Sequence, residues 1–170
     1  KKQAEPGDFQ LGFFFDHTTG MPVIPGSSVK GVLKAVFPKP QEQKEIRAEK
    51  EKYLLDIGKN NLTKEILSSW EVIFFERGQV FFDAYISAFP VDKKIFAEDY
   101  LCPHGDNIFK NPIPIRFLKI APGVTFTFQF MLKDWNDNFK AQHIAGIFKQ
   151  ILLDFGIGAK RNVGYGAFIE

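Results

Sequence analysis

Two periodicities of apolar residues run along the chain, and they separate predicted helices from predicted strands. Apolar positions recur with the spacing of one helical face, i, i+3, i+4 and i+7, in 29–36, 62–74 and 138–155. Strands are predicted at 9–15 and 79–86, and apolar and polar residues alternate, as they do in half-buried strands, in 115–119 and 124–132. Helices and strands mixed in this order predict an α+β fold.

The clearest alternation lies on either side of a turn at 121–123. Ile115 and Phe117 precede this turn, and 124–132 follow it with every second residue apolar. The pattern predicts a β-hairpin with one buried face.

Two segments interrupt the periodic pattern. The residues at about 39–62 are dense in Glu, Lys and Arg, which predicts a solvated helical insertion with i,i+4 ion pairs. The residues at about 90–112 have no sustained period, which predicts an irregular loop. We expect the whole chain, 1–170, to form a single domain that carries these two insertions.

The first predicted helix follows Pro25 and Gly26. Ser27 or Ser28 is placed to cap it, and Lys30 and Lys34 share a face away from the apolar stripe. Free N–H groups, hydroxyls and lysines at a helix start favour a phosphate, while an ordinary capped helix with solvated lysines is an equally open interpretation.

A glycine in the interior of this first helix, Gly31, is a further signal. A glycine in a helix interior costs about 1 kcal/mol relative to alanine. We therefore expect another backbone or a ligand to approach the chain closely at this position.

A glycine-rich loop follows the last predicted helix. Its glycines allow positive φ and close approach to a ligand; they are Gly156, Gly158, Gly164 and Gly166. Lys160 and Arg161 offer charge for phosphate, Asn162 offers an amide, and Tyr165 offers a ring for a base. A helix-ending glycine followed by turn glycines is the purely structural alternative. The loop lacks the Gly-Lys-Ser/Thr step of nucleotide-binding loops, and it follows a helix instead of a strand.

Composition limits the function classes. The 170 residues are 45% hydrophobic with a net charge of +2, so any nucleic-acid contact depends on local clusters instead of the total charge. One cysteine excludes an intrachain disulfide and suits a reducing cytoplasm, and no apolar run approaches the roughly 18 residues of a membrane span. Twenty phenylalanines predict an aromatic core.

The sequence contains few candidate residues for catalysis or for metal binding. Asp16 and His17 stand together in a predicted turn, where an Asx turn beside an exposed histidine is the simpler interpretation. Cys102, His104 and Asp106 offer too few ligands for a zinc site, which needs about four. We expect no metal, no cofactor and no catalytic residue, and we expect His143 to mark a helix boundary.

The early and late motifs together carry a family resemblance. Ile24 to Gly31 and Gly156 to Gly166 resemble the RAMP superfamily of CRISPR proteins. Between them, the segments 80–85, 103–104 and 111–118 resemble the sixth subunits of type III-B Cmr effector complexes. The resemblance implies a ferredoxin-like, RRM-type fold with an antiparallel sheet, a helical insertion and a glycine-rich C-terminal loop. Nothing in 1–8 supplies the strand with which this family begins, which leaves open that the first strand is missing and that the chain is a fragment.

The resemblance also implies a function and partners. It implies a non-catalytic, cytoplasmic subunit in antiviral defence that binds guide RNA and caps the backbone of the complex at the 3′ end of the guide. Target RNA is a further candidate ligand. The implied protein partners are other Cmr subunits, especially the repeating backbone subunit, the small helical subunit and the first subunit. By motif, the RNA-facing residues are Ser27, Ser28, Lys30, Lys34, Lys160, Arg161, Asn162 and Tyr165.

Two alternatives remain open from the residues. One is a metal-independent endoribonuclease that processes guide precursor, with His17 as general base and Lys160 or Arg161 stabilising the phosphorane. The other is an assembly subunit whose phenylalanine-rich surface binds proteins and makes little contact with RNA.

Overall fold

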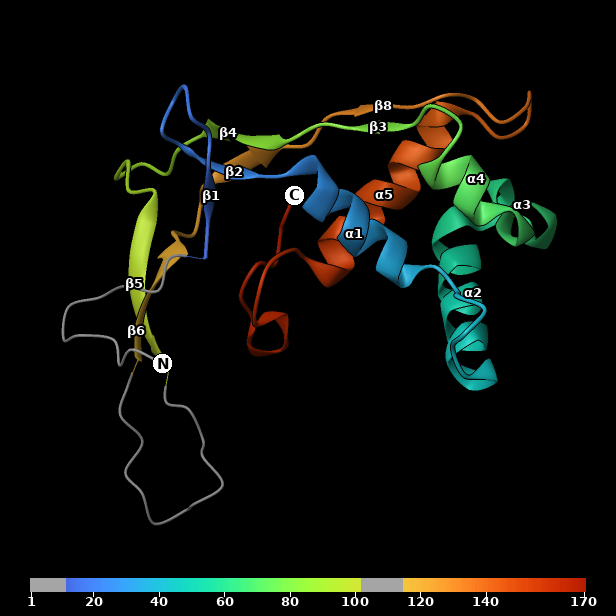
Figure 1. The fold of residues 1–170 in the computed structure, drawn as a ribbon, viewed down its shortest axis with the longest axis horizontal. Coiled ribbons are helices and arrows are strands. Elements are labelled where there is room, and N and C mark those ends of the chain that lie inside the picture. The colour runs from blue at the N-terminus through green and yellow to red at the C-terminus, as the bar shows by residue number, and fades with distance from the viewer. Residues whose placement is uncertain (1–11, 102–114) are drawn as a thin grey trace, which may run out of the picture. The chain divides into compact units, whose positions relative to one another are not determined.

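The computed structural model describes residues 12–101 and 115–170, and the chain divides into two compact units (Figure 1). The first unit comprises Lys1–Val23 and Tyr85–Thr127, and the second comprises Ile24–Ala84 and Phe128–Glu170. None of the described helices is long and apolar enough to cross a membrane.

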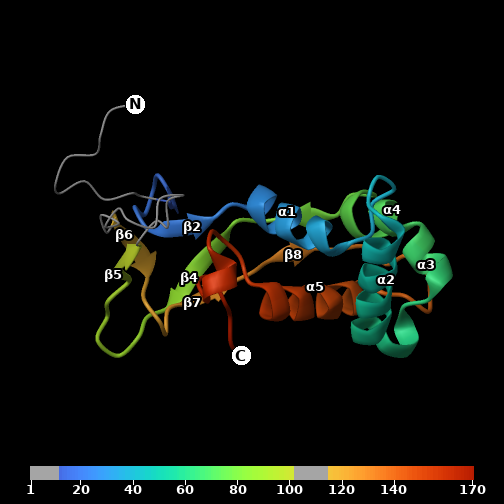
Figure 2. The same cartoon turned by 90° about the horizontal axis from the view of Figure 1, so that it is seen from below.

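The second unit holds the helices and one short antiparallel ribbon. Its elements are α1 (Gly26–Val36), α2 (Lys44–Gly58), η1 (Lys59–Asn61), α3 (Lys64–Ser68), α4 (Trp70–Phe75), β3 (Val80–Phe81), β8 (Phe130–Met131), α5 (Ala141–Phe155) and η2 (Arg161–Val163). In the ribbon, Phe81 lies opposite Phe130 and faces inward, where α1 and α5 cover it (Figures 1 and 2).

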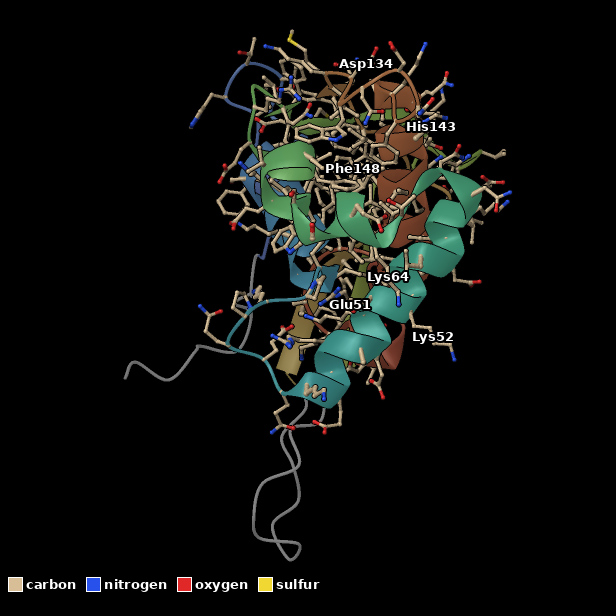
Figure 3. All side chains as sticks on the ribbon, turned by 90° about the vertical axis from the view of Figure 1, so that its right-hand side faces the viewer. Glu51, Lys52, Lys64, Asp134, His143 and Phe148 are labelled. Carbon is tan, nitrogen blue, oxygen red and sulfur yellow. The ribbon has the colours of Figure 1, made fainter. Side chains whose placement is uncertain are left out.

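Phenylalanines build the core of this unit, as their abundance predicts. Phe148 of α5 lies within 6 Å of the ring centroids of Phe74, Phe75, Phe81 and Phe130, and Figure 3 shows it among the surrounding helices. Clustered rings of this kind contribute about 0.5–1.5 kcal/mol per pair beyond the area that they bury. The core therefore holds α1, α4 and α5 and the inner face of the β3–β8 ribbon together.

The first unit is built of strands. Its elements are β1 (Phe14–Phe15), β2 (Pro22–Ile24), β4 (Ala84–Ala88), β5 (Phe96–Leu101), β6 (Ile115–Ile120) and β7 (Thr125–Thr127). One sheet has the order β1-β2-β4-β7, and β5 and β6 form a separate antiparallel ribbon. Two ion pairs, Glu98 with Arg116 and Asp99 with Lys119, link the strands of that ribbon.

The predicted class is confirmed, since helices combine with antiparallel strand pairs. The predicted hairpin of 115–132 is wrong in its partners: β6 pairs with β5, β7 pairs with β4, and β8 pairs with β3. Part of the predicted irregular loop is also a strand, because β5 lies within 90–112. Alternation identifies a strand by its own residues, whereas the partner is set by residues far away in sequence.

The predicted helices are present with altered bounds. The charged segment contains α2, as predicted. Within the described part of the chain, however, the ion pair of this helix joins Lys50 to Glu42, which lies before the helix begins. No i,i+4 ion pair forms between described residues of α2, so that part of the prediction is wrong. The predicted helix of 62–74 is broken at Ser69 into α3 and α4. The segment 1–8, where the first strand was in question, lies outside the described residues.

Candidate nucleic-acid interface

The start of α1 is fixed by close packing on the strand β3. A Cβ atom on Gly26 would lie 2.1 Å from the backbone oxygen of Phe81, so only glycine allows this approach. Pro25 occupies the capping position, and Ser27 and Ser28 stand inside the first turn. The prediction that a serine caps this helix is therefore wrong.

The cap comes from Asp83, a residue that sequence reasoning did not select. Its carboxylate Oδ1 accepts a hydrogen bond of 2.7 Å from the backbone N–H of Gly26. A carboxylate at a helix start is stabilising, but it also places negative charge where a phosphate would bind. Fifty-seven residues separate the two partners, and no local sequence pattern could have joined them.

The two lysines of α1 differ in their surroundings. Lys34 forms an ion pair with Glu71 and lies 5.8 Å from the centroid of the Trp70 ring. Lys30 lies 5.5 Å from the centroid of the Phe81 ring. An ion pair offsets the charge of Lys34, so Lys30 is the stronger candidate for a phosphate contact on this helix.

Gly31 faces open space. Apart from its chain neighbours and the backbone of α1 itself, no described atom lies within 4 Å of a Cβ atom built on this residue. The expectation that another part of the backbone approaches Gly31 is therefore wrong within the described residues, whereas a ligand remains a prediction.

The glycine-rich loop is closed at its neck. The N–H of Ile157 donates to the carbonyl oxygen of Gly166 at 2.9 Å. Cβ atoms would clash across this neck, because one on Gly156 would lie 2.2 Å from the Gly166 oxygen and one on Gly166 would lie 2.0 Å from the Ile157 oxygen. Ile157 is buried in the core of the second unit, so the neck is anchored there.

The tip of the loop presents the predicted cations to solvent. Lys160 has a left-handed backbone with φ of 62°, and η2 begins immediately after it. Lys160, Arg161 and Asn162 are exposed, and Tyr165 is half-buried. The guanidinium of Arg161 donates to the carbonyl oxygen of Phe155 at 3.2 Å, which directs this side chain back towards the end of α5.

One core supports both groups of candidate residues. Val29 and Leu33 from the buried face of α1 share it with Ile157 from the neck of the loop. The structure thus attaches the cations of α1 and those of the loop to the same rigid support. Such support lowers the entropy lost when a ligand binds.

The histidine candidates have structural surroundings. Asp16 accepts hydrogen bonds from the N–H groups of Thr18 and Thr19 and from the Thr19 hydroxyl, and these bonds, those from Thr19 above all, lower the pKa of Asp16. This is the predicted Asx turn, and His17 stands exposed beside it. His143 accepts the backbone N–H of Lys140 through Nδ1 at the start of α5.

The metal candidates cannot be placed. Cys102, His104 and Asp106 lie outside the described residues. Within 12–101 and 115–170, no group of three His, Cys, Asp or Glu side chains could hold an ion.

These features define an α+β protein with a glycine-rich loop that is closed at its neck and presents basic residues at its tip. The chain belongs to the RAMP superfamily, whose family model matches residues 5–169. No curated protein sequence matches it.

Solved structures of other proteins share the fold, among them the following two. The crystal structure of Cmr6 from Pyrococcus furiosus matches with a TM-score of 0.56 and 23% identity, over 93% of this chain and 91% of that chain. A chain of the cryo-EM structure of the type III-B Cmr-beta bound to cognate target RNA matches with a TM-score of 0.57 and 23% identity. The match covers 92% of this chain but 47% of that one, so this chain spans about half of its length.

Proposed function

We propose that this chain is a non-catalytic RNA-binding subunit of a type III-B CRISPR effector complex. In this proposal it caps the backbone of the complex at the 3′ end of the guide RNA, in the cytoplasm. The observation that carries the proposal is the glycine-rich loop of this RAMP-superfamily chain, which is closed at its neck and exposes Lys160, Arg161 and Asn162 at its tip. The likeness of the fold to Cmr6 supports the assignment to this complex.

The loop and α1 have the chemistry for the RNA backbone. Exposed Lys160 and Arg161 neutralise phosphates, and Ser27, Ser28, Lys30 and Asn162 add hydrogen-bond donors. Lys34 contributes less, because Glu71 offsets its charge. Tyr165 is only half-buried, so its ring retains exposed surface on which a base can stack. Phosphate contacts carry little sequence information, which suits a protein that accepts guides of many sequences.

Partner subunits are proposed to bind the first unit. Its large apolar side chains are exposed, Phe14 to 64%, Phe89 to 50% and Tyr100 to 60%. Exposed aromatic residues are enriched at protein interfaces. The proposed partners are the repeating backbone subunit, the small helical subunit and the first subunit of the complex.

The test measures the binding of single-stranded RNA at several salt concentrations. Lys160→Ala/Arg161→Ala should weaken binding several-fold and reduce the slope of log affinity against log salt by about 0.7 for each lost phosphate contact. The matched control is Lys44→Ala/Lys52→Ala, which removes the same charge from the exposed face of α2. Equal loss in both variants would mean that only net charge matters, and this would contradict the proposal.

Cleavage is checked on the same samples with a denaturing gel. We expect intact RNA with the wild-type protein and unchanged binding in His17→Ala. Cut RNA that becomes intact in His17→Ala would establish the nuclease alternative. If neither the loop variant nor the α2 control changes RNA affinity, the assembly alternative replaces the proposal.

A further inference from the structure

A hollow of about 640 Å³ lies in the second unit, away from the glycine-rich loop in sequence. One wall comes from 60–66, where η1 leads into α3, and the other comes from 135–138, in the segment between β8 and α5. Figure 2 shows this second segment passing beside α3. Neither wall contains a residue of the candidate interface described above.

The hollow combines an apolar floor with a rim of amides. Ile66 and Trp135 are half-buried and pack against the core. Asn60, Asn61 and Asn138 are exposed, and within the described part of the chain their side-chain amides make no hydrogen bond. An amide both donates and accepts, which matches the edge of a nucleobase, and the apolar floor suits its flat face.

Local hydrogen bonds hold both walls in place. The hydroxyl of Thr63 accepts the N–H of Ile66 at the start of α3. On the other wall, the Oδ1 atom of Asn136 accepts the N–H groups of Asn138 at 2.9 Å and Phe139 at 2.8 Å. A hollow with fixed walls loses little conformational entropy when it is filled.

One charged side chain, Glu65, lines the hollow, and a second, Arg77, lies against Trp135. Hydrogen bonds within the first turn of α3, the one with Thr63 foremost, lower the pKa of Glu65, so this carboxylate is ionised at neutral pH. An ionised carboxylate can accept a hydrogen bond from a ribose 2′-hydroxyl. Arg77 does not line the hollow, but its guanidinium lies 4.8 Å from the centroid of the Trp135 ring and donates to the Trp135 carbonyl oxygen at 3.5 Å, which places a positive charge next to the Trp135 wall.

We propose that this hollow binds one ribonucleotide. The amides of Asn60, Asn61 and Asn138 bind the base edge, Glu65 accepts the 2′-hydroxyl, and Arg77 attracts the phosphate. The ligand is either a free mononucleotide or an unpaired nucleotide of an RNA strand, which share this chemistry. The proposal goes beyond the RNA contacts of the glycine-rich loop and does not rest on them.

The test titrates the full chain with 5′-AMP, 5′-dAMP and ribose 5-phosphate while the asparagine side-chain amides are followed by NMR. We expect the amide signals of Asn60, Asn61 and Asn138 to shift with 5′-AMP. We expect 5′-dAMP to bind several-fold more weakly and ribose 5-phosphate to bind at least tenfold more weakly, because each lost hydrogen bond costs about 1 kcal/mol. A single-stranded RNA hexamer that displaces 5′-AMP identifies an RNA strand as the source, and failure to displace it identifies a free nucleotide; both support the site.

Variants separate the site from the rest of the molecule. Asn60→Ala/Asn61→Ala should weaken 5′-AMP about tenfold, through two lost hydrogen bonds, and Glu65→Gln should bring the 5′-AMP and 5′-dAMP affinities close together. Gln129→Ala removes an exposed amide elsewhere and should change nothing. Lys160→Ala/Arg161→Ala should bind 5′-AMP as the wild type does. The test of the hollow therefore stays valid even if the glycine-rich loop proves not to bind RNA. Unshifted asparagine amides, or equal affinity in Asn60→Ala/Asn61→Ala, would overturn the inference.

Discussion

Asp83 shows how a single side chain sets the electrostatics of a helix start. Its carboxylate binds the N–H of Gly26, so α1 begins with a negative charge beside it. The early motif was expected to offer free N–H groups to phosphate, and it offers fewer than expected because the protein supplies its own acceptor. Binding by α1 then depends on Lys30 and the serine hydroxyls more than on the helix dipole.

Asp83→Asn tests this account. The amide oxygen of asparagine still accepts the N–H of Gly26, so the fold is kept while the charge is removed. We expect RNA to bind roughly two- to fivefold more tightly at low salt, the effect of 0.3–1 kcal/mol typical of a charge at a helix start. Asp92→Asn, an exposed carboxylate of the first unit, is the control. Equal tightening in both variants would assign the effect to net charge.

Gly31→Ala should have opposite effects on the stability of the fold and on the affinity for RNA. No described atom stands near its Cβ position, so alanine should raise the free energy of unfolding by about 1 kcal/mol. If RNA lies against this face, the same methyl group should weaken RNA binding. Denaturant unfolding and RNA titration of the same preparation measure both quantities. Destabilisation by alanine would show that the site is not open.

At the scale of elements, the link between α2 and α5 depends on Tyr53. Its hydroxyl donates to Asp154 at 2.7 Å, and its ring meets Phe155 edge-on with centroids 5.3 Å apart. In Figure 3, Lys52 of the same helix projects away from the other helices. Burial, followed by the bond to Asp154, raises the pKa of Tyr53 above its usual range.

The raised pKa gives this link a pH dependence. The folded-state pKa lies above the unfolded value of 10.0, so the stability from this group is fully present below pH 10 and is lost as pH rises through the folded-state pKa. Tyr53→Phe keeps the ring and removes the hydroxyl, which should cost about 1 kcal/mol at neutral pH. Ultraviolet titration of the wild type and of Tyr53→Phe should show that the tyrosine lost in the variant is one that ionises above the ordinary pKa. Loss of a tyrosine that ionises at the ordinary pKa would contradict this assignment.

Elements with local causes could be predicted from sequence, whereas those with distant causes could not. The stripe at Val29 and Leu33 indicated α1, and Gly156 marked the end of α5, because both signals lie within a few residues. The pairing of β6 with β5 was missed, since the alternation of 115–119 fits any partner. The exposed cations of the glycine loop were predicted by residue type. Its glycines indicated a close approach of some kind, but they could not show that the approach is between Gly156, Ile157 and Gly166 themselves.

At the scale of the whole molecule, the two units differ in how they are stabilised. All buried hydrophobic residues of the core cluster belong to the second unit. Within 12–23, 85–100 and 116–127 of the first unit, only Pro22 is buried. Strand pairing, together with ring contacts such as that of Phe13 with Phe96, holds the unit together. Stability per residue should therefore be lower in the first unit.

Native-state hydrogen exchange should reveal this difference. We expect the central amides of α5, around Phe148 and Ile151, to exchange only on global unfolding. The amides paired between β5 and β6 should exchange at least about a hundredfold faster, because little buried apolar surface opposes their opening. Addition of partner subunits should slow exchange in the first unit if they cover its exposed aromatic residues. Equal protection in both units would refute the assignment of low stability.

The hydrogen bond between Ile157 and Gly166 has a consequence for variation of the loop. Because the chain enters and leaves through one closed neck, the residues between can differ in length or type without transmitting a change to the core. The tip can therefore be exchanged while the core of the second unit keeps its structure. Specificity can change there by insertion or replacement at little cost in folding, and a fluorescent label or a short peptide placed beside Asn162 should report on binding while the fold remains the same.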